Sequence, residues 1–108
     1  MTKITFYKSG KEYKGFKCSG HADFADEGKD IVCAALSILT INLVNSIETF
    51  TDDSFKGEQD EESGLISLMF TGDISKESDL LVKSFELGVI CIKNQYGKKY
   101  LDIKYKEV

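Results

Sequence analysis

Residues 31–50, IVCAALSILTINLVNSIETF, are the longest apolar run in this chain. Their apolar side chains fall on nearly every side of a 3.6-residue period, which predicts a long helix that is buried on most sides. Ser37 and Thr40 interrupt the run with polar groups, which argues against a membrane-spanning segment. Asp30 stands directly before the run and suits an N-cap, so the helix is predicted to begin there with Cys33 in its first turn.

The segments on either side of this helix alternate between apolar and polar residues, as strands do. One hairpin precedes the helix, a second hairpin follows it, and a last strand comes after a second helix that Ser75 opens. The predicted strands are 4–8, 13–18, a short one near Phe55, 65–70 and 100–105, and 21–29 is predicted to be a loop. This order, ββαββαβ, predicts an α+β fold in which two helices pack on a mainly antiparallel sheet.

The size and composition of the chain fit one folded domain over residues 1–108. The chain has 42% hydrophobic residues and no proline, which is typical of a packed globular domain without a linker. The net charge of −4 disfavours nucleic acid or an anionic membrane as a direct partner, because both require a basic surface. Three cysteines without framework spacing indicate a reducing compartment, so we expect the protein in the cytoplasm.

His21 and Cys33 are the clearest candidates for chemistry. His21 is the only histidine of the chain, and a histidine can act as the base for a cysteine nucleophile. A helix start would favour the thiolate over the free thiol, whose pKa is about 8.5, and its unpaired amides would stabilise an oxyanion. Gly20 would permit a tight bend before His21, and Ser37 lies one helical turn after Cys33 on the same face.

Other interpretations of these residues stay open at this point. Cysteine is often buried, so Cys33 in an apolar run would by itself suit the core, as Cys18 and Cys91 do. Cys18, His21 and Cys33 also have spacing that suits zinc, but a fourth ligand is not evident, so neither a metal site nor a cofactor is predicted. Asp30 is a candidate both for the helix cap and for a group that orients the histidine.

A family resemblance adds to this interpretation. Gly20-His21-Ala22, followed by the segment 30–35, DIVCAA, and by Ser37, resembles the signature of the bacterial ribosomal-processing cysteine proteases, the Prp or YsxB-like family. Chain length and the predicted order of elements are similar as well. The resemblance implies that Cys33 is the nucleophile and His21 the general base, and that Gly20, Asp30 and Ser37 support the site.

The resemblance also implies a substrate and an assembly state. It implies a homodimeric endopeptidase that removes the N-terminal extension of a large-subunit ribosomal protein, number twenty-seven, during ribosome assembly. An acidic enzyme would suit a basic ribosomal protein. The main alternative is a non-enzymatic, ribosome-associated module that binds a peptide without cleaving it.

Overall fold

The computed structural model describes residues 2–20, 27–60, 64–97 and 99–108 of the chain. Two strands come first, and a helix, a second pair of strands, a second helix and a last strand follow, so the predicted order is confirmed. The elements are β1 (Thr2–Ser9), β2 (Glu12–Ser19), α1 (Glu27–Phe50), β3 (Phe55–Asp60), β4 (Leu65–Phe70), α2 (Lys76–Ile92), a π-helical turn η1 (Lys93–Gly97) and β5 (Leu101–Glu107).

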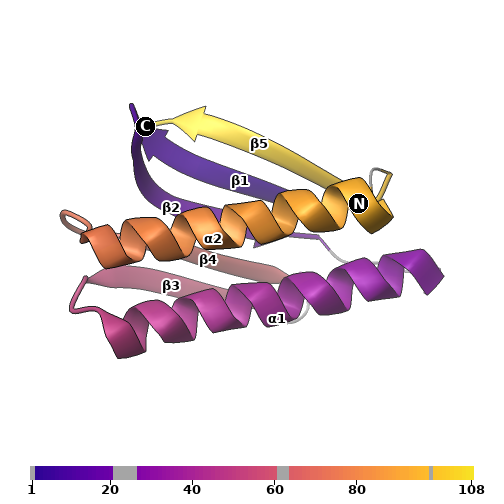
Figure 1. Cartoon of the computed structure of the whole chain (residues 1–108), viewed down its shortest axis with the longest axis horizontal. Coiled ribbons are helices and arrows are strands. Elements are labelled where there is room, and N and C mark those ends of the chain that lie inside the picture. Colours follow the sequence, from indigo (N-terminus) through magenta and orange to yellow (C-terminus); the bar gives the residue numbers. More distant parts are fainter. Residues whose placement is uncertain (1, 21–26, 61–63, 98) are drawn as a thin grey trace.

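The five strands form one sheet in the order β3-β4-β2-β1-β5. All neighbours pair antiparallel except β1 and β5, which are parallel, so the prediction of a mainly antiparallel sheet is confirmed. The two helices run antiparallel to each other along one face of the sheet (Figure 1). The fold is therefore a two-layer α+β sandwich with β3 and β5 at the edges of the sheet.

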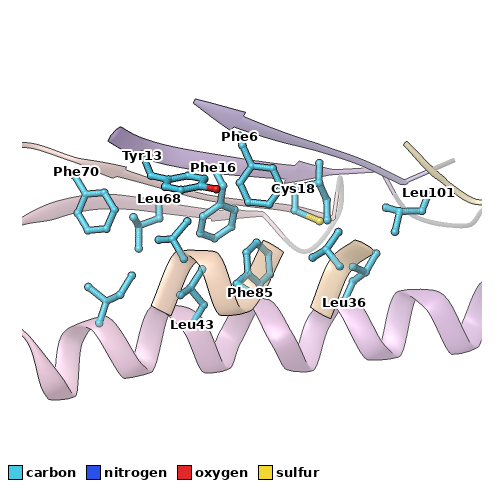
Figure 2. Close-up of a cluster of buried hydrophobic side chains, with 14 of the residues drawn as sticks. Phe6, Tyr13, Phe16, Cys18, Leu36, Leu43, Leu68, Phe70, Phe85 and Leu101 are labelled. Carbon is cyan, nitrogen blue, oxygen red and sulfur yellow. The ribbon is translucent and has the colours of Figure 1, made fainter. Parts of the chain in front are cut away.

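The hydrophobic core fills the layer between the sheet and the helices, as Figure 2 shows. Phe6 of β1 and Phe16 of β2 are directly paired across the strands, and both are fully buried. Each packs against Phe85 of α2, with ring centroids 5.8 and 5.0 Å away. Tilted aromatic rings at such distances are favourable contacts, so these three residues fix α2 on the centre of the sheet.

Helix α1 buries only one stripe of its apolar residues, so the prediction that it is buried on most sides was wrong. Val32, Leu36 and Ile47 face the sheet, whereas Ile31 is 50% exposed and Ile38 is 70% exposed. The segment 31–50 is long and apolar enough to cross a membrane, but the buried core helices of soluble proteins meet the same criterion. The composition of the segment predicted an apolar helix, but it did not predict which sides of that helix the rest of the protein covers.

The start of α1 also differs from the prediction. The helix begins at Glu27, so Asp30 is its fourth residue and not its N-cap, and Cys33 is its seventh residue. Acidic residues are favourable both at an N-cap and in a first turn, so the sequence pattern alone did not distinguish the two positions. Because only the first four amides of a helix lack an internal acceptor, the amide of Cys33 is not one of the free donors predicted to hold an oxyanion.

Helix α2 begins as predicted, with Ser75 as its N-cap. The Ser75 hydroxyl accepts a hydrogen bond from the Ser78 amide at 3.1 Å and donates one to Asp53 Oδ2 at 2.6 Å. Asp53 Oδ2 also accepts the Ser75 amide at 3.0 Å and the hydroxyl of the buried Ser78. These hydrogen bonds from Ser75 and Ser78 lower the pKa of the Asp53 carboxyl below its ordinary value of 3.8.

This cluster predicts a specific loss of stability in acid. A carboxyl whose pKa is lower in the folded state stabilises the fold above its unfolded pKa, and that contribution disappears as the pH falls through the folded value. We expect Asp53→Asn to be less stable than the wild type at pH 7, with a difference that shrinks as the pH falls below about 4. Urea midpoints measured from pH 7 to pH 2 test this, and Asp52→Asn at the exposed neighbouring position is the control. A constant difference over that range would contradict the assignment.

Candidate active site

Cys33 lies on the side of α1 that faces the start of β1, and its side chain is partly exposed. Its sulfur is 3.9 Å from the hydroxyl of Thr2, a buried residue at the beginning of β1. A cavity of about 70 Å³ opens beside this thiol. Its walls come from both layers of the fold: Thr2, Cys18, Gly20, Cys33, Leu36, Ser37, Thr40, Gly64 and Ile66.

The end of β2 forms part of the cavity wall. Lys3 of β1 pairs with Ser19, the last residue of β2, and their neighbours Thr2 and Gly20 both line the cavity. Cys33 of α1 lines the same cavity wall as these two residues. The φ of 87° at Gly20 belongs to the left-handed region that favours glycine, and this supports the predicted tight bend before His21.

The three cysteines have different environments. Cys18 is buried in the core as predicted, and burial together with the charge of an ionised Cys33 raises its pKa to about 11. Figure 2 shows Cys18 pointing from the sheet into the layer that Leu36 of α1 also occupies. Cys91 was predicted to be core but is exposed on α2. Only Cys33 combines partial exposure with a place on the wall of a cavity, so it is the candidate nucleophile.

The other predicted site residues divide into two groups. Gly20 and Ser37 line the same cavity as Cys33, so the structure brings these three together. Asp30 lies in the first turn of α1, one turn before Cys33. His21, the predicted base, lies outside the described residues, and it follows directly after Gly20 in the chain.

Sequence reasoning missed several residues of this cavity. Thr2, Gly64 and Ile66 line it, yet none of them belongs to a recognisable motif. For Thr2 a signal was available, because strand alternation puts it on the same face as the buried Ile4 and Phe6. The sequence did not predict that Thr2, on this face of β1, lies next to the thiol of Cys33.

The zinc alternative finds no support in the described part of the chain. Within residues 2–20, 27–60, 64–97 and 99–108, no group of three histidine, cysteine or acidic side chains is arranged to hold a metal ion. The proposed set included His21, which is outside those ranges.

The comparisons with known proteins all find similarity to one family of cysteine proteases. The sequence model of the family described as cysteine protease Prp matches residues 1–101. The ribosomal processing cysteine protease Prp of Staphylococcus aureus (strain Mu50 / ATCC 700699) is 26% identical over 87 residues, which cover 81% of each chain. The protein of the same name from Bacillus subtilis (strain 168) is 25% identical over 101 residues, which cover 89% of this chain and 90% of the relative.

Solved structures share the fold over nearly the whole chain. The crystal structure of S. aureus Prp in complex with a substrate peptide has a TM-score of 0.89 at 21% identity and covers 98% of this chain and 100% of its own. The structure of SMU.848 from Streptococcus mutans has a TM-score of 0.87 at 28% identity and covers 100% and 99%. Because the family match spans almost every element, from β1 to the start of β5, this chain belongs to the cysteine protease Prp family.

Proposed function

We propose that this protein is an endopeptidase that removes the N-terminal extension of large-subunit ribosomal protein number twenty-seven during ribosome assembly. The observation that carries the proposal is the position of Cys33, a partly exposed thiol on the wall of a cavity between the two layers. The names of the S. aureus and B. subtilis relatives, ribosomal processing cysteine proteases, support the substrate class. Membership of a cysteine protease family favours this function over a module that only binds peptides.

In the proposed reaction His21 takes the proton from the Cys33 thiol, and the thiolate attacks the carbonyl carbon of the scissile peptide bond. The imidazolium then gives its proton to the leaving amine, and a thioester joins Cys33 to the acyl part of the substrate. Water hydrolyses the thioester and regenerates the thiol. Ser37 lines the cavity one turn from Cys33, so its hydroxyl is a suitable donor for the thiolate or for the oxyanion.

A peptide assay tests the proposed reaction. The protein is incubated with a peptide that spans the cleavage region of the ribosomal protein precursor, and the products are identified by mass. We expect two fragments whose masses add to that of the peptide plus one water. Prior alkylation with iodoacetamide should abolish both fragments, and peptide mapping should place the modification on Cys33. If the untreated protein yields no fragments from this peptide or from the full precursor, the proposed function is wrong.

We also propose that the protein is a cytoplasmic homodimer. All three cysteines are free, which suits a reducing compartment. Leu80 and Leu87, two turns apart on α2, are 68% and 64% exposed, and exposed apolar residues on one helix face are typical of an interface.

The dimer proposal predicts the effect of a charge on this face of α2. Sedimentation equilibrium should give twice the chain mass of 12.1 kDa for the wild type, and Leu87→Glu should shift the protein toward the monomer because it buries a charge in the interface. Glu77→Gln, an exposed change in the first turn of the same helix, is the control. A monomeric wild type at micromolar concentration would exclude this dimer.

A further inference from the structure

A second thiol borders the cavity at Cys33, and the proposed reaction does not use it. Cys18 of β2 and Cys33 of α1 line this cavity together, although they come from different layers of the fold. A cavity of only about 70 Å³ keeps the residues on its wall close to one another. Burial raises the pKa of Cys18 most, and the charge of an ionised Cys33 raises it further, so the two groups interact across this space.

Cys18 occupies an apolar position of the sheet. Its partners on the neighbouring strands are Ile4 of β1 and Ile66 of β4, and its side chain is buried. Figure 2 shows its sulfur directed from the sheet toward the layer of the helices. A small apolar residue such as alanine or valine would also fill this position, so packing alone does not require a thiol there.

The two thiols are the only side chains that a peroxide can readily oxidise among the described residues of the wall. The other described wall residues are apolar, glycine or hydroxyl-bearing: Thr2, Gly20, Leu36, Ser37, Thr40, Gly64 and Ile66. The Thr40 hydroxyl is already engaged, because it donates a hydrogen bond to the Leu36 carbonyl at 2.6 Å. Oxidation chemistry at this part of the cavity therefore involves Cys33 and Cys18 alone.

The environments of the two thiols set the order in which they react. Peroxides oxidise exposed thiolates first, and Cys33 is partly exposed whereas Cys18 is buried. Burial and the charge of an ionised Cys33 raise the pKa of Cys18 to about 11, so Cys18 remains a thiol while Cys33 reacts. Once Cys33 has become a neutral sulfenic acid, its charge no longer raises the pKa of Cys18, and Cys18 ionises more readily.

We propose that Cys18 is a resolving cysteine, which forms a disulfide with Cys33 after hydrogen peroxide has oxidised Cys33. In the first step the Cys33 thiolate attacks the peroxide, an S–O bond forms, the O–O bond breaks, and hydroxide leaves and becomes water. In the second step the Cys18 sulfur attacks the Cys33 sulfur, the S–S bond forms, the S–O bond breaks, and hydroxide leaves with the proton of Cys18 as water. The two thiols together lose two electrons and two protons, and the peroxide is reduced to two molecules of water.

The cavity provides the space in which the disulfide forms. A disulfide holds its two Cβ atoms about 3.8 Å apart, so Cys33 approaches β2 and the cavity between the two walls closes. Cys33 lies within the first two turns of α1, so the approach requires a shift of that end of the helix. The disulfide prevents irreversible oxidation of Cys33, and cellular thiols can reverse it. That it also stops peptide cleavage rests on the proposed function.

Mass spectrometry of the oxidised protein tests the pairing independently of any peptidase activity. The reduced protein is treated with hydrogen peroxide, unfolded in the presence of iodoacetamide and digested. We expect alkylation of Cys91 only, and a pair of peptides that is two hydrogens lighter than the sum of its parts and joins Cys18 to Cys33. The yield should not depend on protein concentration, because the link lies within one chain. Irreversible oxidation of Cys33 while Cys18 is still alkylated, or a link through Cys91, would overturn the proposal.

Matched cysteine variants show whether the link protects the enzyme. Cys18→Ala and Cys18→Val remove the second thiol with side chains of different size, and in both we expect Cys33 to end as the sulfinic acid. After peroxide and then dithiothreitol, the fraction of its own initial activity that either variant recovers should be at least tenfold below that of the wild type. Cys91→Ala, which removes an exposed thiol on α2, should recover as the wild type does. Full recovery in the Cys18 variants would contradict the proposal. If the untreated wild type cleaves no peptide, the proposed function is wrong, and the mass of the linked peptides still decides the disulfide.

Discussion

Cys33→Ala is expected to reduce cleavage of the precursor peptide at least about 1,000-fold, because the remaining groups cannot form the thioester. Cys18 does not replace the lost thiol, since burial, the larger cause of its raised pKa, keeps it protonated at neutral pH. Initial rates of fragment formation, quantified by mass, measure the effect. Binding of the uncleaved peptide should persist, because the substitution removes only the sulfur atom and leaves the other residues of the cavity wall unchanged.

Two controls make this result specific to Cys33. Cys91→Ala removes an exposed thiol on α2 and should leave the rate unchanged. The Cys33→Ala protein should unfold within a few degrees of the wild type, since Cys33 is only partly buried and its sulfur contacts one hydroxyl at 3.9 Å. Cleavage at the wild-type rate in a folded Cys33→Ala protein would show that another group is the nucleophile.

Gly15→Ala, which adds a single methyl group, should lower the free energy of unfolding by about 3 kcal/mol. A Cβ at Gly15 would lie 2.2 Å from the carbonyl oxygen of Leu68 and 2.9 Å from Cα of Met69, so the backbone of the neighbouring strand would have to move. Gly15 also has a φ of 156°, and the β1–β2 register shifts next to it, between Tyr7 and Lys8. A bulge of this kind commonly depends on a residue without a side chain.

The urea midpoint of Gly15→Ala, measured by circular dichroism, tests this prediction. Gly72→Ala is the matched control, since its added Cβ meets nothing within 4 Å. It should be as stable as the wild type or slightly more stable, because alanine restricts the unfolded chain. Equal midpoints for the wild type and Gly15→Ala would mean that β2 and β4 are not packed as closely as described.

The local sequence pattern was sufficient to predict the order of the elements. Alternation identified β1, β2 and β4, and Ser75 marked the start of α2 because its hydroxyl caps the amide of Ser78, three residues later. The strand β3 was predicted only as a short strand near Phe55. The local pattern did not predict the contacts between residues that are distant in the sequence. The exposure of Ile38 and Cys91 depends on which side of each helix meets the sheet, and an apolar helix gives no local signal for this.

The candidate site was predicted only in part, for a related reason. Cys33, Gly20 and Ser37 were singled out from the sequence, and all three line one cavity. The spacing of Cys33 and Ser37 reflects local helix geometry, whereas the approach of Gly20 to Cys33 is a tertiary one between β2 and α1. The contact between Cys33 and Thr2 joins residues 31 positions apart, and it follows from the way α1 lies across β1. The prediction that Asp30 is the helix cap was wrong, because an acidic residue suits both an N-cap and a first turn.

The parallel pairing of β5 with β1 has a consequence for when this enzyme becomes competent. The Thr2 amide donates a hydrogen bond to the carbonyl of Tyr100 at 2.9 Å, and Thr2 pairs with Leu101, so β5 holds the residue that contacts Cys33. The site thus joins the first and last segments of the chain. During synthesis the site is complete only after β5 has been translated and has paired with β1, so we expect the nascent protease to be inactive until that pairing has formed.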